Sequence, residues 1–347
     1  MTSATSTAAP AAANSGQHGA ARIAGLALCL ALLVVLALAS VAVGARSLPL
    51  STVLDALLAP DGSYDAAVVA RQRVPRTVLA IAVGAALGVA GALMQALTRN
   101  PLADPGLLGV NGGAAAAVVS AISFLGLTSP LEYIWFAFAG AGAAAVIVYT
   151  IGATGRATGP VRLALAGTAV SAALIAYTWA VQLADDKALD QFRFWIVGGL
   201  AGRGLDVLVP MAPFLALGVL AGLALAWPLN VLALGDDTSR ALGLRLGHTR
   251  LAAAGVITVL CGAATAAAGP FSFVGLAVPH AARALVGPDQ RWVLAYSALL
   301  GPCLVLAADV TGRVLLDLGE LEAGLVTAFV GAPLFIALIR RRRMAQL

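Results

Sequence analysis

Residues 73–113 read RVPRTVLAIAVGAALGVAGALMQALTRNPLADPGLLGVNGG, and this stretch decides the fold. An arginine-flanked turn precedes an apolar helix that contains Gly84 and Gly88, whose small size lets helices pack closely inside a membrane. A polar break at residues 99–101 then ends that helix, because a proline ring prevents a helix from continuing. A second apolar helix follows at once. A soluble core does not need this arrangement, so the stretch predicts membrane-embedded helices.

The composition of the whole chain supports the same interpretation. Hydrophobic residues make up 61% of it and charged residues 11%, whereas charged residues are about a quarter of a typical soluble domain. A membrane-spanning helix needs about 20 consecutive apolar residues. Candidate spans lie at residues 23–43, 78–97, 107–125, 134–151, 163–181, 207–226, 251–268, 274–285, 293–308 and 325–339. The sequence therefore predicts an all-α integral membrane protein with about ten transmembrane helices.

The distribution of basic residues predicts how these spans are oriented. With the N-terminus in the cytoplasm, most of the 21 basic residues fall on the cytoplasmic side, including the run at 340–343. Because lysine and arginine favour cytoplasmic loops, this bias predicts an N-in, C-in topology. Arg71, Arg73 and Arg76 lie together on the outer side, against the rule. By residue type alone, they either pair with an acidic partner or anchor the helix at the lipid headgroups.

Some segments do not fit a regular span. Residues 1–21 are small, polar and of low complexity, which predicts a disordered cytoplasmic tail. A transmembrane domain at 22–340 and a basic cytoplasmic tail at 341–347 follow. The segment 269–283, GPFSFVGLAVPHAAR, is too short for a simple crossing. Because irregular backbone at membrane depth persists only inside protein or beside a cavity, we expect a broken or re-entrant element there.

Residues that carry catalytic or metal chemistry are scarce. The single lysine, Lys187, does not lie in a G-x-x-x-x-G-K-[ST] motif, so the chain has no phosphate-binding loop for hydrolysing ATP. Its three histidines and three cysteines are not spaced as a metal site or a disulfide framework. No nucleophile can be paired with a base. We therefore expect no enzyme activity, no bound cofactor and no metal.

The loop at residues 229–250 is the one long cytoplasmic loop that the topology predicts inside the transmembrane domain. Within it, residues 238–242 predict a short helix that is N-capped near Asp237 and ended by Gly243. A short helix followed by a glycine and a further turn fits a groove on a cytoplasmic partner. A solvated connector has the same pattern.

Six motifs occur in order along the chain: GAALGVAGALMQALTRNPLADPGLLGVNGGA, FRFWIVGGLAGR, LNVLALGDDTSRALGL, GPFSFVGLAVPHAARALVG, LAADVTGR and GLVTAFVGAPLF. Together they resemble the permease subunits of FecCD-type ABC importers for iron-siderophores, haem and vitamin B12. The resemblance covers nearly the whole chain and implies a multi-pass permease of type II ABC importer architecture in the cytoplasmic (inner) membrane. It also implies a second permease subunit, two ATPase subunits that use ATP and Mg²⁺, and an extracytoplasmic siderophore-binding protein. Membrane lipid surrounds such a permease, and no nucleic acid is expected.

The resemblance also assigns roles to residues at matching positions. The positions that dock the binding protein are Arg73, Arg76 and Arg313. The segment that couples to the ATPase contains Gly235, Asp236, Asp237, Ala241, Leu242 and Gly243. Gate or pathway candidates are Thr158, Gly159, Pro160, Val161 and Gln95. Structural roles fall to Arg99 and Asn100, which hold the break at Pro101, and to Gly84, Gly88 and Pro279.

One turn departs from the family pattern. Where the family usually has P-x-E-L-P-x-G, this chain has LGELEAG, with Leu318 and Glu322 in place of the two prolines. Glu320 and Gly324 are kept. Since proline restricts a turn, we expect this turn to be looser and the geometry around Arg313 to be affected.

The resemblance implies the import of a ferric siderophore, and QALTRNPLADPGLLGVNGGA at 95–114 favours the catecholate type. Haem or cobalamin is the alternative substrate. A heterodimer with a related permease is favoured over a homodimer. An ion-coupled secondary transporter is a less supported alternative, because it needs carboxylates or ion sites at mid-membrane. Asp309 is the only candidate for such a carboxylate, and it lies near a helix end.

Overall fold

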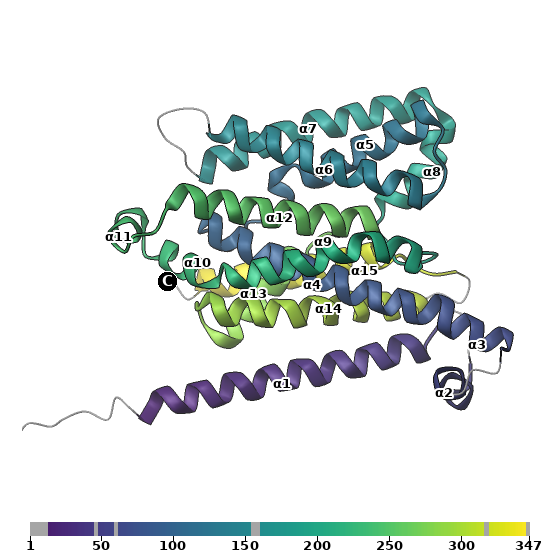
Figure 1. The fold of residues 1–347 in the computed structure, drawn as a ribbon, viewed down its shortest axis with the longest axis horizontal. Coiled ribbons are helices and arrows are strands. Elements are labelled where there is room, and N and C mark those ends of the chain that lie inside the picture. The colour runs from purple at the N-terminus through teal and green to yellow at the C-terminus, as the bar shows by residue number, and fades with distance from the viewer. Residues whose placement is uncertain (1–12, 45–47, 59–61, 154–159, 316–318, 345–347) are drawn as a thin grey trace, which may run out of the picture.

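The computed structural model describes residues 13–44, 48–58, 62–153, 160–315 and 319–344, and no strand occurs among them. The apolar helices lie roughly along one direction (Figure 1). They are α1 (Ala13–Ala42), α4 (Val74–Thr98), α5 (Val110–Leu125), α6 (Pro130–Ala153), α7 (Pro160–Ala184), α9 (Leu205–Ala224), α12 (Leu246–Ala268), α13 (Val274–Val286), α14 (Gln290–Val314) and α15 (Ala323–Met344). Short elements connect them: α2 (Leu50–Leu58), α3 (Tyr64–Val68), the π-helix η1 (Val69–Arg73), the 3-10 helix η2 (Pro105–Leu108), α8 (Asp186–Ile196), α10 (Ala226–Ala233) and α11 (Asp236–Ala241).

The predicted all-α membrane fold is confirmed. Among the described residues, seven helices are long and apolar enough to cross a membrane, and α5, α13 and α15 contribute shorter apolar helices at three further predicted positions. Hydropathy did not predict α2, α8 and α10, because each is shorter than a span. The chain is therefore a multi-pass membrane protein.

The two ends of the bundle carry different elements. Both described termini lie at the same end as α11, whereas α2, α3 and α8 lie at the opposite end (Figure 1). We call these the α11 end and the α3 end. Helix α1 begins at Ala13, inside the segment 1–21 that was predicted to be disordered. After Pro10 no proline occurs in that segment, so nothing stops the helix from extending past its apolar run.

Helix α4 lies at the centre of the bundle and packs against α14, α12, α13 and α9. Most of its residues are buried. A Cβ added at Gly84 would lie 2.6 Å from Cα of Pro302, and a Cβ at Gly91 would overlap the carbonyl oxygen of Gly275. Glycine is required where backbones approach this closely. The glycines of residues 84–91 therefore place α4 directly against α13 and α14.

The segment before α13 contains the irregular backbone that the sequence predicted. After α12 ends at Ala268, Gly269 has φ +75° and Phe273 has φ +66°, a left-handed value that is uncommon outside glycine. Helix α13 then continues through Pro279 to Val286. The break thus lies between Gly269 and Phe273, and Pro279 is a buried residue inside a regular helix.

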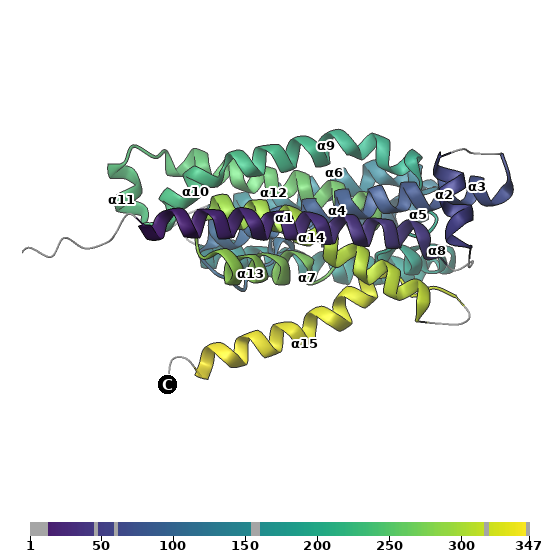
Figure 2. The ribbon, with the colours of Figure 1, turned by 90° about the horizontal axis from the view of Figure 1, so that it is seen from below.

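Three helices lie at the periphery of the bundle. Helix α1 packs mainly on α14, α7 exposes much of its length, and α15 leaves the bundle along its C-terminal half (Figure 2). Large apolar side chains are exposed on all three, for example Leu28 of α1, Trp179 of α7 and Phe329 of α15. Such surfaces face lipid or another protein subunit.

Candidate functional sites at the two ends of the bundle

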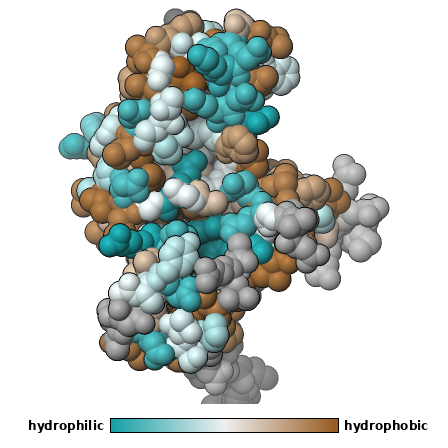
Figure 3. All heavy atoms as spheres, turned by 90° about the vertical axis from the view of Figure 1, so that its right-hand side faces the viewer, coloured by the Kyte–Doolittle hydropathy of each residue, from teal (hydrophilic) through white to brown (hydrophobic). Residues whose placement is uncertain are grey.

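A polar pocket opens at the α3 end, where hydrophilic residues gather across the middle of the face between apolar flanks (Figure 3). The cavity has a volume of about 530 Å³. Its charged lining residues are Arg71, Arg73, Arg76, Arg203, Arg313, Asp206 and Glu320. We call it the arginine pocket. Five guanidinium groups against two carboxylates give its wall a positive charge.

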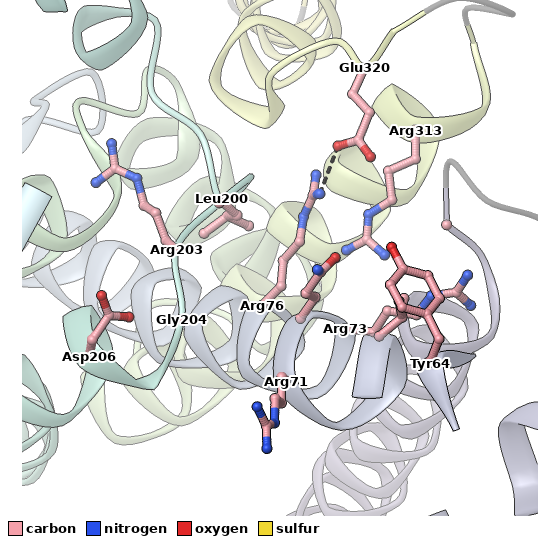
Figure 4. A pocket seen from close by; sticks show the side chains of 14 residues that line it. Tyr64, Arg71, Arg73, Arg76, Leu200, Arg203, Gly204, Asp206, Arg313 and Glu320 are labelled. Atoms are coloured by element: carbon pink, nitrogen blue, oxygen red, sulfur yellow. Dashed lines mark hydrogen bonds and ion pairs between the residues drawn. The ribbon is translucent and has the colours of Figure 1, made fainter. Parts of the chain in front are cut away.

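Arg76 of α4 is held by two carboxylates. Its guanidinium lies 2.7 Å from Oδ1 of Asp309 on α14 and 2.7 Å from Oε2 of Glu320, which precedes α15. Figure 4 shows Arg76 reaching toward Glu320, while Arg71 points away from this pair. Asp309 is completely buried and also accepts from Arg313, four residues along α14. One buried carboxylate therefore serves two arginines.

Arg73 and Arg313 hold the C-terminal end of α1. Arg73 donates from Nη1 to the carbonyl oxygens of Val41 and Ala42, at 3.0 and 2.7 Å. Arg313 donates to the carbonyl oxygens of Ser40 and Val43, at 2.7 and 2.9 Å. The last carbonyls of a helix have no partner inside it, and cations near them also offset the helix dipole. These two arginines therefore cap α1, and both are buried.

This placement bears on the predicted docking role of Arg73, Arg76 and Arg313. All three side chains have partners inside the chain, and only Arg76 among them retains some exposure at the pocket. Docking stays a prediction for them. The exposed arginine of the pocket is Arg71, in the middle of η1, and Arg203 is half-buried.

Glu322, which stands where the family usually has a proline, lies near the arginine pocket. A Cβ added at Gly199 would overlap the Glu322 carboxylate, so the loop before α9 accommodates this side chain only because residue 199 is glycine. Burial raises the pKa of Glu322, against the lowering influence of Arg76 and Arg203. Arg203 in turn donates to the carbonyl oxygen of Ala267 at 2.5 Å. The substituted turn thus adds a carboxyl group beside two arginines.

At the opposite end, α11 projects from the bundle (Figure 1). It spans Asp236–Ala241, and Gly235, with φ +104°, is its N-cap. The predicted N-cap near Asp237 was therefore two residues late, and Asp237 is the second residue of the helix. The first residue, Asp236, pairs with Arg99 and Arg250. Gly243 follows the helix with φ +81°, as the sequence predicted.

Burial alone would raise the pKa of Asp236, but the hydrogen bonds and charges of Arg250 and Arg99 outweigh it and hold this pKa below its ordinary value. Asp237 pairs at 2.9 Å with Arg240 instead, and both side chains are exposed. Ala241 and Leu242 are exposed as well. The residues after Asp236 thus offer an exposed surface at this end.

Residues near the break after α4 have contacts within the chain. Gln95 is buried, donates to the carbonyl oxygen of Leu276 at 3.1 Å and accepts from Arg283 at 3.0 Å. Asn100 accepts from the backbone N–H of Leu102 at 2.9 Å, one residue past Pro101. Gln95 therefore joins α4 to α13, and a pathway role for it stays a prediction.

The gate candidates can be located only in part. Thr158 and Gly159 lie outside the described residues. Pro160 is the first residue of α7, and Val161 is the second. Their gate role stays a prediction.

Sequence reasoning did not find the contribution of Arg203 or the pairing of Asp309 with two arginines. The signal available for Asp309 was its spacing of four residues from Arg313 in LAADVTGR, which places both on one helix face. No signal joined Asp309 to Arg76, since 233 residues separate them.

The fold defines a multi-pass helical membrane protein with a polar site at each end of its bundle. A family model described as the FecCD transport family matches residues 32–341. The chain belongs to this family.

Several known proteins are similar to it. The ferric enterobactin transport system permease protein FepD of Escherichia coli (strain K12) is 48% identical over 315 residues, covering 90% of this chain and 94% of FepD. The hemin transport system permease protein HmuU of Yersinia pestis is 38% identical, covering 92% and 96%. A solved metal-chelate type ABC transporter in an inward-facing conformation aligns with a TM-score of 0.80 at 28% identity, covering 91% and 98%.

Proposed function

We propose that this chain is the permease subunit of a binding-protein-dependent ABC importer that carries a ferric siderophore across the cytoplasmic (inner) membrane. Membership of the FecCD transport family and the similarity to a solved ABC transporter support the permease role. Transport by alternating access needs a path that opens to each side in turn. The energy for that change is proposed to come from separate ATPase subunits.

One arrangement carries the proposal: α4 connects the arginine pocket at one end to the contacts of α11 at the other. Arg76, near the start of α4, lines the pocket, and Arg99, directly after α4, pairs with Asp236 of α11. A positive pocket fits an acidic surface of an extracytoplasmic binding protein. The exposed α11 fits a groove on an ATPase. The arginine pocket thus suits the proposed binding protein, and the exposed α11 suits the proposed ATPase.

The catecholate type is the favoured siderophore, because FepD, at 48% identity, is named for ferric enterobactin. Haem or cobalamin remains the alternative, since HmuU, named for hemin, covers a similar share of the chain, 92% against 90% for FepD. The two substrates differ in shape and charge, so the residues that line the path would decide between them.

The proposed assembly contains two permease subunits, two ATPase subunits and a binding protein. The exposed apolar side chains of α7 and α15, such as Trp179 and Phe329, offer a surface for the second permease subunit, for which a related but different chain is favoured. Residues 158–161 are proposed to narrow the cytoplasmic end of the path. ATP and Mg²⁺ would bind the ATPase subunits, and we propose no cofactor for this chain itself.

An ion-coupled carrier remains the less supported candidate. Asp309, its only candidate carboxylate, is completely buried and paired with Arg76 and Arg313. Both of its carboxylate oxygens already accept hydrogen bonds from these two guanidinium groups. Asp309 is therefore part of a fixed arginine cluster and is not placed in an open ion site.

The test measures ATP hydrolysis in proteoliposomes that contain this chain, co-expressed with its partner permease and ATPase. Binding protein loaded with a ferric catecholate siderophore, haem or cobalamin is added in separate arms. We expect stimulation by the first and not by the others. Absence of any associated ATPase in the wild-type preparation would refute the importer proposal.

The docking surface is tested by Arg71→Glu, which reverses the exposed charge of the arginine pocket. The matched control is Arg193→Glu on α8, an exposed arginine at the same end that does not line the pocket. We expect Arg71→Glu alone to abolish stimulation at equal basal turnover. Equal behaviour of the two variants would place the docking surface elsewhere.

A further inference from the structure

The Asp236 carboxylate at the start of α11 is shared by arginines from two other elements. Its Oδ1 lies 2.5 Å from Nη2 of Arg99, directly after α4, and its Oδ2 lies 2.8 Å from Nη2 of Arg250 on α12. We call these three residues the Asp236 clasp. Charge-assisted hydrogen bonds of this kind are roughly twice as strong as neutral ones. The clasp therefore ties α11 to both helices.

Arg99 is itself firmly placed. It is the C-cap of α4 with φ +51°, one of the two non-glycine residues with positive φ in the described part of the chain. Its Nη2 also donates to the carbonyl oxygen of Leu232 on α10, at 2.7 Å. A non-glycine residue persists in this backbone region only where its surroundings determine it. Arg99 is thus a fixed junction of α4, α10 and α11.

Helix α11 has little else to hold it. It has six residues, and isolated helices of this length are not stable in water. Ser239 is its buried residue, and its hydroxyl bonds back to the carbonyl oxygens of Val231 and Gly235. The bond to Val231 joins α11 to the adjacent α10 and not to α4, and the bond to Gly235 stays at the start of α11 itself. The link to the central helix passes through Arg99.

Helix α4 extends from this junction to the arginine pocket as a closely packed unit. The glycines at 84–91 place it against α13 and α14 without intervening side chains, so it cannot bend locally without overlap. Near its other end, Arg76 is paired with Asp309 and Glu320 at the pocket. A displacement of Arg99 along the helix axis therefore reaches Arg76.

We propose that Arg99 is the positioning residue through which α11 and the arginine pocket influence each other, by way of Asp236 and the α4 helix. This inference rests on the proposed function, in which an ATPase contacts α11 and a binding protein contacts the pocket. Coupling of this kind is reciprocal. Binding protein at the pocket would shift α11, and ATP-driven movement of α11 would shift the pocket.

The clasp offers a matched comparison, because Arg99 and Arg250 contact the same carboxylate and only Arg99 belongs to α4. Arg99→Met removes the α4 link but keeps an unbranched aliphatic side chain. The strain of the left-handed backbone at residue 99 is therefore unchanged. Arg99→Lys retains the charge and one nitrogen that can donate to both acceptors, but its side chain is shorter and lacks the rigid planar guanidinium. Arg250→Met removes only the α12 link. Arg291→Met is the control outside the clasp, because Arg291 is an exposed arginine of α14 at the same end of the bundle.

The experiment measures the ratio of stimulated to basal ATP hydrolysis in the full complex, normalised to the amount of assembled complex. We expect Arg99→Met to lower this ratio about fivefold or more, which is the lower range of measured couplings between sites. The ratio for Arg99→Lys should lie between those of Arg99→Met and wild type. Arg250→Met should lower the ratio less than Arg99→Met does. Arg291→Met should leave the ratio unchanged. In the isolated chain, hydrogen exchange of the α11 amides should be faster in Arg99→Met than in wild type.

An unchanged ratio in Arg99→Met would overturn the inference while leaving the importer proposal intact. An equal loss in Arg250→Met would also overturn it, because the carboxylate would then serve only the local order of α11. If the wild-type chain associated with no ATPase, the proposed function would fail instead. Hydrogen exchange is measured on the isolated chain without partners. It therefore tests the role of Arg99 in ordering α11 even if the proposed function fails.

Discussion

Arg76 and Asp309 form an ion pair between α4 and α14, with 2.7 Å between Nη2 and Oδ1 and no solvent exposure of the carboxylate. Arg313 shares that carboxylate. Through Arg313, the same group reaches the C-terminal carbonyls of α1. Asp309 thus supplies the buried counter-charge shared by Arg76, in the wall of the arginine pocket, and Arg313, at the end of α1.

Asp309→Asn is expected to destabilise the protein strongly. It keeps the size of the side chain but leaves Arg76 and Arg313 without their buried counter-charge, and removing one partner of a buried ion pair costs about 3–5 kcal/mol. Thermal unfolding in detergent measures the loss. Asp190→Asn is the control, because its pair with Arg193 is exposed and such pairs contribute about 0–1 kcal/mol. Equal midpoints for the two variants would contradict the central role of Asp309.

Gly91→Ala is expected to destabilise the packing of α4 on α13. The added methyl group would overlap the carbonyl oxygen of Gly275, so the two backbones would have to separate. Gly142→Ala in α6 is the matched control, because no atom lies within 4 Å of its Cβ position. Alanine is also the better helix former. Thermal unfolding in detergent should therefore give a lower midpoint for Gly91→Ala only, and an unchanged midpoint would refute the close approach.

Glu322→Gln is expected to stabilise the protein at neutral pH. Burial raises the pKa of Glu322 in the folded state, so its folded form binds the proton more tightly than the unfolded form does. Stability is then greatest below the ordinary glutamate pKa of 4.5 and falls as pH rises from there through the raised folded value. Glutamine carries no charge and removes this loss. The unfolding midpoint of the variant should exceed that of wild type by a margin that grows as the pH rises from 4 to 8. A margin that stays constant with pH would contradict the raised pKa of Glu322.

Arg73→Gln is expected to loosen the end of α1. The guanidinium donates to the carbonyl oxygens of Val41 and Ala42, and a glutamine side chain is too short to hold both. Hydrogen exchange in residues 37–44 should become faster. Arg71→Gln is the control, because Arg71 lies in the middle of η1 and is exposed. If both variants exchanged equally fast, Arg73 would not be the residue that caps α1.

The sequence predicted the helical membrane fold because hydropathy reports directly on the solvent around each segment. Apolar runs such as 23–43 and 78–97 can be stable only in a bilayer or a large core, and the charges between them divide the chain into spans. Short elements such as α8 and α11 are not visible in hydropathy. The predicted helix at 238–242 began two residues late and ended one residue late, because the N-cap is Gly235 and not a residue near Asp237.

The sequence by itself determined the class of the protein, its family and the positions of its polar motifs. Only the tertiary structure decided which charges meet. Asp309 and Arg76 are 233 residues apart, and Arg99 and Asp236 are 137 apart. Their pairing depends on how α4 packs against α14 and on how the loop after α10 folds back. The physical reason is that a charge inside a bilayer protein must find a partner in space, and local sequence does not specify which one.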